Sequence, residues 1–134
     1  MRLIALHIFK WAEQSPVLLC SEMELSMLWF YQKDMAKQHC NFNARMIAER
    51  IPPGNKASVA LENNAATCYC WTTKDGLSAT AITDNEYPER ASFILLNTLI
   101  MDFRECFPDS SVFDGITNDN QVRYENLPIF LRKW

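Results

Sequence analysis

The first strand-like segment of the chain, residues 2–11, is apolar on both of its sides, which constrains the fold more than any other feature. Alternate side chains of an extended segment point to opposite sides. The apolar residues alternate around one histidine, with Leu3, Ala5, His7, Phe9 and Trp11 on one side and Ile4, Leu6 and Ile8 on the other. A strand without a polar face must be shielded from water on both faces of its sheet. The segment therefore predicts a central strand with helices on both sides of the sheet.

Strand-like runs and turn signals in the rest of the chain predict a mostly antiparallel sheet. The predicted strands cover residues 2–11, 17–22, 56–61, 65–73 and 77–83. The Lys74-Asp75-Gly76 sequence is typical of a hairpin turn between the last two strands. Short connections of this kind favour antiparallel neighbours.

Three helices complete the prediction. Asp34 is a candidate N-cap for a helix over residues 35–51, which Pro52 and Pro53 end. Pro88 begins a second helix that runs to residue 107, a polar loop covers residues 108–121, and a short helix covers residues 122–134. The resulting order, β-β-α-β-β-β-α-α, predicts an α+β sandwich.

Composition limits the function classes. A chain of 134 residues, of which 49% are hydrophobic, suits one domain over residues 1–134 with one shared core. Thirteen basic against sixteen acidic residues give a net charge of −3, which argues against a nucleic-acid partner. Five scattered cysteines indicate reduced thiols in the cytoplasm rather than a disulfide framework, and no segment reaches transmembrane length.

The helix predicted over residues 35–51 carries two apolar stripes. One stripe contains Ala36, Cys40, Ala44, Ile47 and Ile51, and the other contains Met35, His39, Phe42 and Met46. One stripe can cover the sheet. The other is then covered by loop residues such as Trp29 and Phe30, or it lines a groove with Val59 and Leu61 of the neighbouring strand. The candidate groove residues are therefore Met35, His39, Phe42, Met46, Val59 and Leu61.

Residue patterns for catalysis, metals and cofactors are missing, so we expect none of the three. His7 lies on an apolar strand and is expected in the core, while His39 has no matched nucleophile in the sequence. Cys68 and Cys70 share one face of a strand, but no second pair of ligands completes a zinc site. A small thiol enzyme that uses Cys40 or Cys70 remains an alternative.

The segment Asp84-Asn85-Glu86-Tyr87-Pro88-Glu89-Arg90, with the Ala91-Ser92-Phe93-Ile94-Leu95-Leu96 that follows, resembles a known family. It is similar to the N-terminal longin domain of the prenylated R-SNAREs of the YKT type, the synaptobrevin homologues. Residues 34–50 align with the first helix of that family, with Phe42 and Arg50 kept. The resemblance covers residues 1–107 and becomes loose from Pro108 onward.

The resemblance implies a profilin-like fold, with one helix on one face of a five-stranded antiparallel sheet and two on the other. It implies a regulatory domain for membrane fusion, in which an apolar groove between the first helix and the third strand binds the protein's own SNARE coil or lipid group. The family residue matched by Phe42 lines that groove. His39 stands where the family has an aromatic residue, so the groove of this chain is expected to be more polar or pH-responsive.

The resemblance also implies partners and a location for the full-length protein. The partners are cognate SNAREs, its own SNARE coil and its lipid group. The location is the cytoplasm, with cycling to Golgi, endosomal and other secretory-pathway membranes. No SNARE coil and no lipidated cysteine motif precede Trp134, so we expect this chain to be one domain of a longer protein that reaches membranes through its missing C-terminal part. A longin-type subunit of an adaptor or tethering complex is the main alternative.

Overall fold

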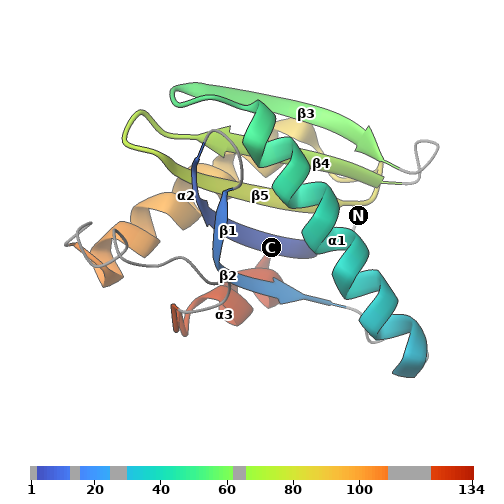
Figure 1. The fold of residues 1–134 in the computed structure, drawn as a ribbon. Coiled ribbons are helices and arrows are strands. Elements are labelled where there is room, and N and C mark those ends of the chain that lie inside the picture. The colour runs from blue at the N-terminus through green and yellow to red at the C-terminus, as the bar shows by residue number, and fades with distance from the viewer. Residues whose placement is uncertain (1–2, 13–15, 25–29, 62–65, 109–121) are drawn as a thin grey trace.

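A five-stranded antiparallel sheet lies between one helix and a pair of helices (Figure 1). The computed structural model describes residues 3–12, 16–24, 30–61, 66–108 and 122–134. The elements follow the order β1 (Leu3–Lys10), β2 (Val17–Met23), α1 (Phe30–Arg50), β3 (Asn55–Leu61), β4 (Ala66–Thr72), β5 (Leu77–Thr83), α2 (Glu89–Cys106) and α3 (Leu127–Lys133). This order and the antiparallel sheet confirm the predicted α+β class.

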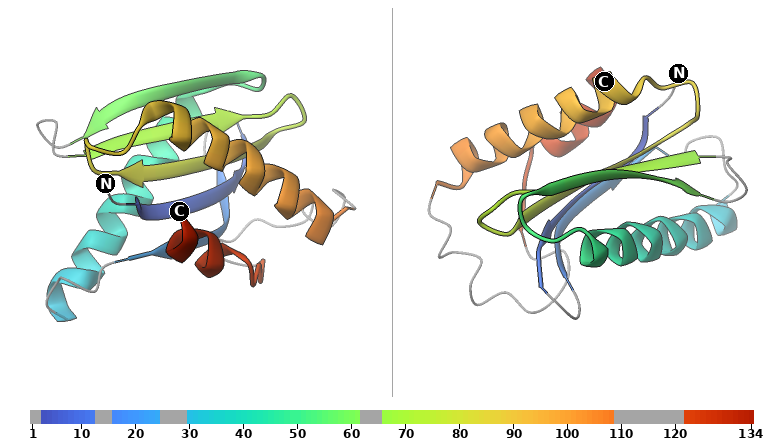
Figure 2. Two further views of the ribbon diagram at one scale, coloured as in Figure 1. Left: turned by 180° about the vertical axis from the view of Figure 1, so that it is seen from behind. Right: turned by 90° about the horizontal axis from the view of Figure 1, so that it is seen from above.

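The strands lie side by side in the order β2-β1-β5-β4-β3. The first strand is therefore central, as its two apolar sides predict, and β2 and β3 form the two edges. Helix α1 contacts β1, β4 and β5 on one face of the sheet. Figure 2 shows α2 and α3 on the opposite face, where α2 contacts β4 and β5 and α3 contacts β1 and β2.

A β-bulge changes which side chains of β1 point to which face. Leu3 pairs with Thr83 of β5 but Ala5 pairs with Ile82, so β1 has one extra residue there. Leu3 consequently packs on the α2 face, whereas Ile4 packs on the α1 face. The predicted strict alternation is wrong at Leu3 and Ile4. From Ala5 to Phe9 the side chains alternate between the two faces as predicted.

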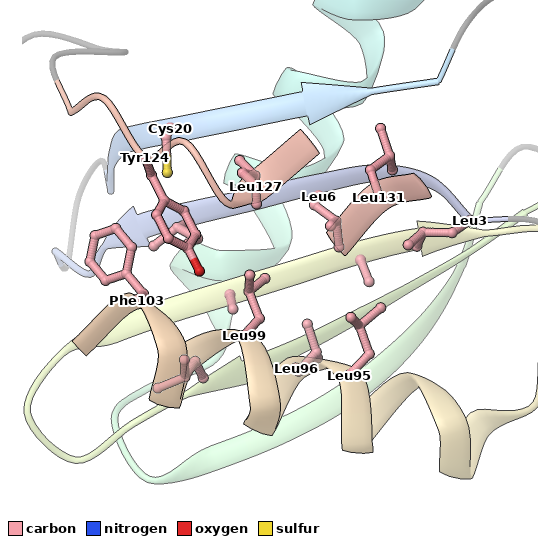
Figure 3. Packing of buried hydrophobic residues seen from close by; sticks show 14 of the residues in the cluster. Leu3, Leu6, Cys20, Leu95, Leu96, Leu99, Phe103, Tyr124, Leu127 and Leu131 are labelled. Carbon is pink, nitrogen blue, oxygen red and sulfur yellow. The ribbon is translucent and has the colours of Figure 1, made fainter. Parts of the chain in front are cut away.

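The larger of the two cores lies between the sheet and the helices α2 and α3 (Figure 3). Leu95, Leu99 and Phe103 of α2 recur at spacings of four and point at the sheet, and all three are fully buried. Tyr124 packs edge-on against Phe103 with ring centroids 5.2 Å apart. Its hydroxyl donates a hydrogen bond to the Asp102 carboxylate, which anchors the segment before α3 to α2.

The smaller core lies between the sheet and α1. Ala44, Ile47 and Ala48 of the helix are buried against Phe9 and other residues of the central strands. Ala44 and Ile47 belong to the stripe of Ala36, Cys40, Ala44, Ile47 and Ile51 that the sequence identifies, whereas Ala48 was not assigned to either stripe. The small side chains of Ala44 and Ala48 let α1 approach the sheet closely.

Two helix boundaries differ from the prediction. Helix α1 begins at Phe30 rather than Met35, so Asp34 lies inside the helix and is not its N-cap. Helix α3 is shorter than predicted because residues 122–126 are not helical and the helix begins at Leu127, with Pro128 in its first turn. The predicted loop over residues 108–121 lies outside the described residues from Asp109 onward. Within the part of the chain that is described, no helix is both long and apolar enough to cross a bilayer.

Candidate groove between helix α1 and strand β3

A tight turn places the end of α1 beside the edge strand β3. The amide of Gly54 donates to the carbonyl of Thr72 on β4 at 2.8 Å, and the Asn55 amide donates to the Pro52 carbonyl at 3.2 Å. Gly54 adopts φ of +88°, a conformation that glycine reaches without steric cost. Because the turn is fixed to β4, the last two turns of α1 and the strand β3 run next to each other.

The space between these two elements forms a groove of about 280 Å³. Helix α1 and the residue after it supply one wall and β3 supplies the other, through Asn43, Met46, Ile47, Arg50, Ile51, Val59, Ala60 and Leu61. Ile47 is buried and belongs to the floor, whereas Val59 is 39% exposed. The exposed apolar surface can therefore receive an apolar side chain or an acyl chain.

The structure brings three of the six predicted groove residues together. Met46, Val59 and Leu61 line the groove. Met35, His39 and Phe42 lie on the exposed side of α1 before the groove begins, and Met35 and Phe42 are 72% and 67% exposed. Phe42 is one helical turn from Met46, so these apolar residues continue the groove along the helix as an open stripe.

Five lining residues were not identified from the sequence. Ile47 and Ile51 were assigned to the stripe that faces the sheet, and both also border the groove. Asn43, Arg50 and Ala60 line the groove beside them. A helical wheel could have indicated Asn43 and Arg50, because they lie on the α1 surface between the two stripes.

A buried polar cluster lies under the middle of α1. The Nε2 of His7 donates to the Oδ1 of Asn41 at 2.8 Å, and the imidazole stacks on Phe9 with centroids 5.9 Å apart. Burial, together with the nearby charge of Arg45 and against the Asn41 hydrogen bond, lowers the pKa of His7 to about 4. His7 is therefore a neutral core residue that links β1 to α1, as the sequence predicts for a core histidine.

Three of the five thiols are buried. Cys68 and Cys70 share the α1 face of β4 and are fully buried, as predicted. Burial raises the pKa of both thiols, and it raises that of Cys20 to about 12. Thiolate is the nucleophilic form of cysteine, so these three residues are poor nucleophiles at neutral pH. Among the described residues, no three His, Cys, Asp or Glu side chains are grouped to hold a metal ion.

Comparison with known proteins identifies a matching family model, described as Longin, a regulated-SNARE-like domain, over residues 27–124. The VAMP-like protein YKT61 of Arabidopsis thaliana is 30% identical over 112 residues, which are 82% of this chain. The synaptobrevin homologue ykt6 of Schizosaccharomyces pombe is 31% identical over all 134 residues, and that of Eremothecium gossypii is 25% identical over the same length.

This chain accounts for only part of each relative. The matched region covers 55% of the Arabidopsis protein and 66% of each of the two fungal proteins. The groove described above lies within the residues matched by the family model.

Proposed function

Because the chain belongs to the longin family of regulated-SNARE-like domains, we propose that it is the N-terminal regulatory domain of a vesicle-trafficking R-SNARE. In this role the groove between α1 and β3 binds the SNARE coil or the lipid group of the same protein. The observation that carries the proposal is the apolar lining by Met46, Val59 and Leu61, which is open to solvent beside the exposed Phe42.

Membership in this family, whose members are not enzymes, confirms the expectation that the chain is not an enzyme. The thiol-enzyme alternative fails for Cys70, because this thiol is buried and its pKa is raised. The VAMP-like and synaptobrevin-homologue names of the relatives favour an R-SNARE over an adaptor or tethering subunit.

The groove offers an energetic reason for a closed state. An exposed amphipathic coil or acyl chain presents apolar surface to water, and burial of one leucine- or phenylalanine-sized side chain stabilises by about 1.5–3 kcal/mol. Two or three such side chains in the groove are enough to favour the closed state over the open state by more than tenfold. A SNARE partner that engages the coil shifts the same equilibrium toward the open state.

The proposal places the full-length protein in the cytoplasm in its closed state. Opening exposes the coil to cognate SNAREs and the lipid group to Golgi, endosomal and other secretory-pathway membranes. The longin domain then controls fusion through the occupancy of its groove.

Backbone amide NMR tests the groove directly. We expect dodecyl-chain detergent monomers, and separately a peptide of the SNARE coil of the full-length protein, to shift the signals of Met46, Val59 and Leu61. The shifts should extend along α1 to Phe42, His39 and Met35. A ligand that shifts none of these signals would contradict the proposal, because an occupied groove must change the environment of its lining.

The variant Phe42→Glu sharpens the test. Since Phe42 is 67% exposed, the substitution should leave the unfolding temperature nearly unchanged and weaken binding of either ligand several-fold by placing a charge beside the groove. The matched control is Ile129→Glu, which alters an exposed apolar residue of α3 (49% exposed) on the other face. Unfolding of Phe42→Glu, or equal loss of binding in both variants, would refute the groove assignment.

A further inference from the structure

We propose that the face of the sheet opposite the α1–β3 groove carries a second docking site, which binds an acidic peptide segment through one apolar anchor side chain. The site is a pocket between the second half of α2 and the turn that joins β4 to β5. Its volume is about 540 Å³, within the range of about 300–1,000 Å³ found for ligand sites in proteins. This assignment goes beyond the proposed function, since it concerns another face and another partner.

The turn that forms one wall of the pocket is fixed before any ligand binds. Arg104 of α2 donates to the Thr73 hydroxyl at 3.0 Å and forms an ion pair with Asp75. The Thr73 amide donates to the Leu77 carbonyl at 2.9 Å, and the Gly76 amide donates to the Thr73 carbonyl at 3.0 Å. The turn therefore loses little conformational entropy when a ligand binds, and this lowers the cost of binding a short peptide.

Three apolar side chains line the pocket among polar ones. Trp71 of β4 lines it half-buried, Ile100 of α2 is buried within it, and Met101 remains 60% exposed at its mouth. Ile94, 49% exposed, lies two helical turns before Met101 on the same side of α2. Methionine adapts its shape to different partners, so this surface suits an inserted leucine- or phenylalanine-like side chain.

The charges at the pocket select the flanking residues of the partner. Lys74 and Arg104 line it together with one carboxylate, Asp75. The ammonium of Lys56 lies 5.1 Å from the ring centroids of both Trp71 and Phe93 and adds positive charge next to the floor. The chain as a whole carries a net charge of −3, so this local excess of positive charge contrasts with the overall acidic balance. Carboxylates beside the anchor residue would complement it.

A display library of random 12-residue peptides, selected on the folded chain, tests this proposal. The expected consensus is an apolar anchor flanked by two or more Asp or Glu residues. A fluorescein-labelled peptide of that consensus should shift the NMR signals of the Trp71 indole and the Met101 methyl group. Its binding should persist when dodecyl detergent fills the α1–β3 groove, which separates this site from the proposed function.

Charge-reversal variants provide the second readout. Lys74→Glu should weaken peptide binding about tenfold at low salt and by less at high salt, because the contact is at the solvent-exposed rim. The matched control Lys133→Glu makes the same change on α3 and should leave affinity unchanged. Both lysines are exposed, so neither variant is expected to unfold.

Several outcomes would overturn the proposal. They are a selection that enriches no peptide, a consensus without acidic residues, shifts confined to the α1–β3 groove, and equal affinities of Lys74→Glu and the unchanged chain. Sedimentation with anionic phosphatidylserine vesicles is the competing arm. Vesicle binding that Lys74→Glu abolishes, without binding of acidic peptides, would reassign the face to a membrane surface.

Discussion

Acidification should destabilise the domain through the single buried histidine. The pKa of His7 is about 4 in the folded state, against 6.5 for an ordinary histidine. The unfolded chain therefore binds a proton that the folded chain excludes at pH values between these two. The stabilisation is fully present above pH 6.5 and is lost as the pH falls toward 4.

The magnitude follows from the shift. About 2.5 pH units, at about 1.4 kcal/mol each, give a loss of roughly 3 kcal/mol between pH 6.5 and pH 4. This is a large part of the 5–15 kcal/mol that typically stabilises a domain. The added proton goes to Nδ1, which is buried without a hydrogen-bond partner, so protonation places a charge in the core under α1 while the Nε2 hydrogen bond to Asn41 stays in place.

Urea unfolding at several pH values between 7.5 and 4 measures this effect. The variant His7→Gln cannot titrate, so the difference in free energy of unfolding between it and the unchanged chain should fall by roughly 3 kcal/mol over that range. The control His39→Gln alters the exposed histidine of α1 and should retain the pH dependence. A difference that stays constant with pH, or a His7 imidazole that titrates near pH 6.5 in NMR, would refute the argument.

Three further predictions concern packing, backbone and thiols. Leu99→Ala removes a fully buried side chain of α2 and should cost about 3 kcal/mol in urea unfolding; a cost below about 1 kcal/mol would show that the core collapses into the cavity. Gly76→Ala meets no neighbouring atom, but φ is +89°, so thermal unfolding should reveal a loss of about 1–2 kcal/mol from backbone strain alone; an unchanged melting temperature would contradict this. Under native conditions N-ethylmaleimide should label the exposed Cys106 before the buried Cys68 and Cys70, as followed by mass spectrometry, and prior labelling of Cys70 would contradict its burial.

The strand pattern was predictable because period-two alternation and turn residues are local signals. The strand predicted over residues 77–83 coincides with β5, and the Lys74-Asp75-Gly76 turn precedes it. The bulge at Ile4 was not predictable, since an extra residue in one strand depends on the partner strand and leaves no mark in the alternation. The early start of α1 at Phe30 was missed because aromatic residues do not indicate a helix by themselves.

The sequence could indicate which side of α1 faces away from the sheet, but not how far along the helix the groove extends. A helical wheel separates the stripe of Ala44 and Ile47, which packs on the sheet, from the stripe of Phe42 and Met46. It does not show where along the helix a neighbouring strand ends. Helix α1 is about 31 Å long by its 21 residues and β3 about 23 Å by its seven. The groove exists only where the two elements run side by side, and Met35 lies outside it.

The interior position of β1, between β2 and β5, has a consequence for the order in which the molecule assembles. Ile8 pairs with Ala79, so the central strand pair closes a loop of roughly 70 residues. At synthesis rates of about 5–20 residues per second, β1 waits roughly 4–14 seconds on the ribosome before β5 has been made. During that time a strand that is apolar on both sides has only β2 to pair with. Nascent-chain folding should therefore be late and cooperative, and aggregation of incomplete chains should depend on β1.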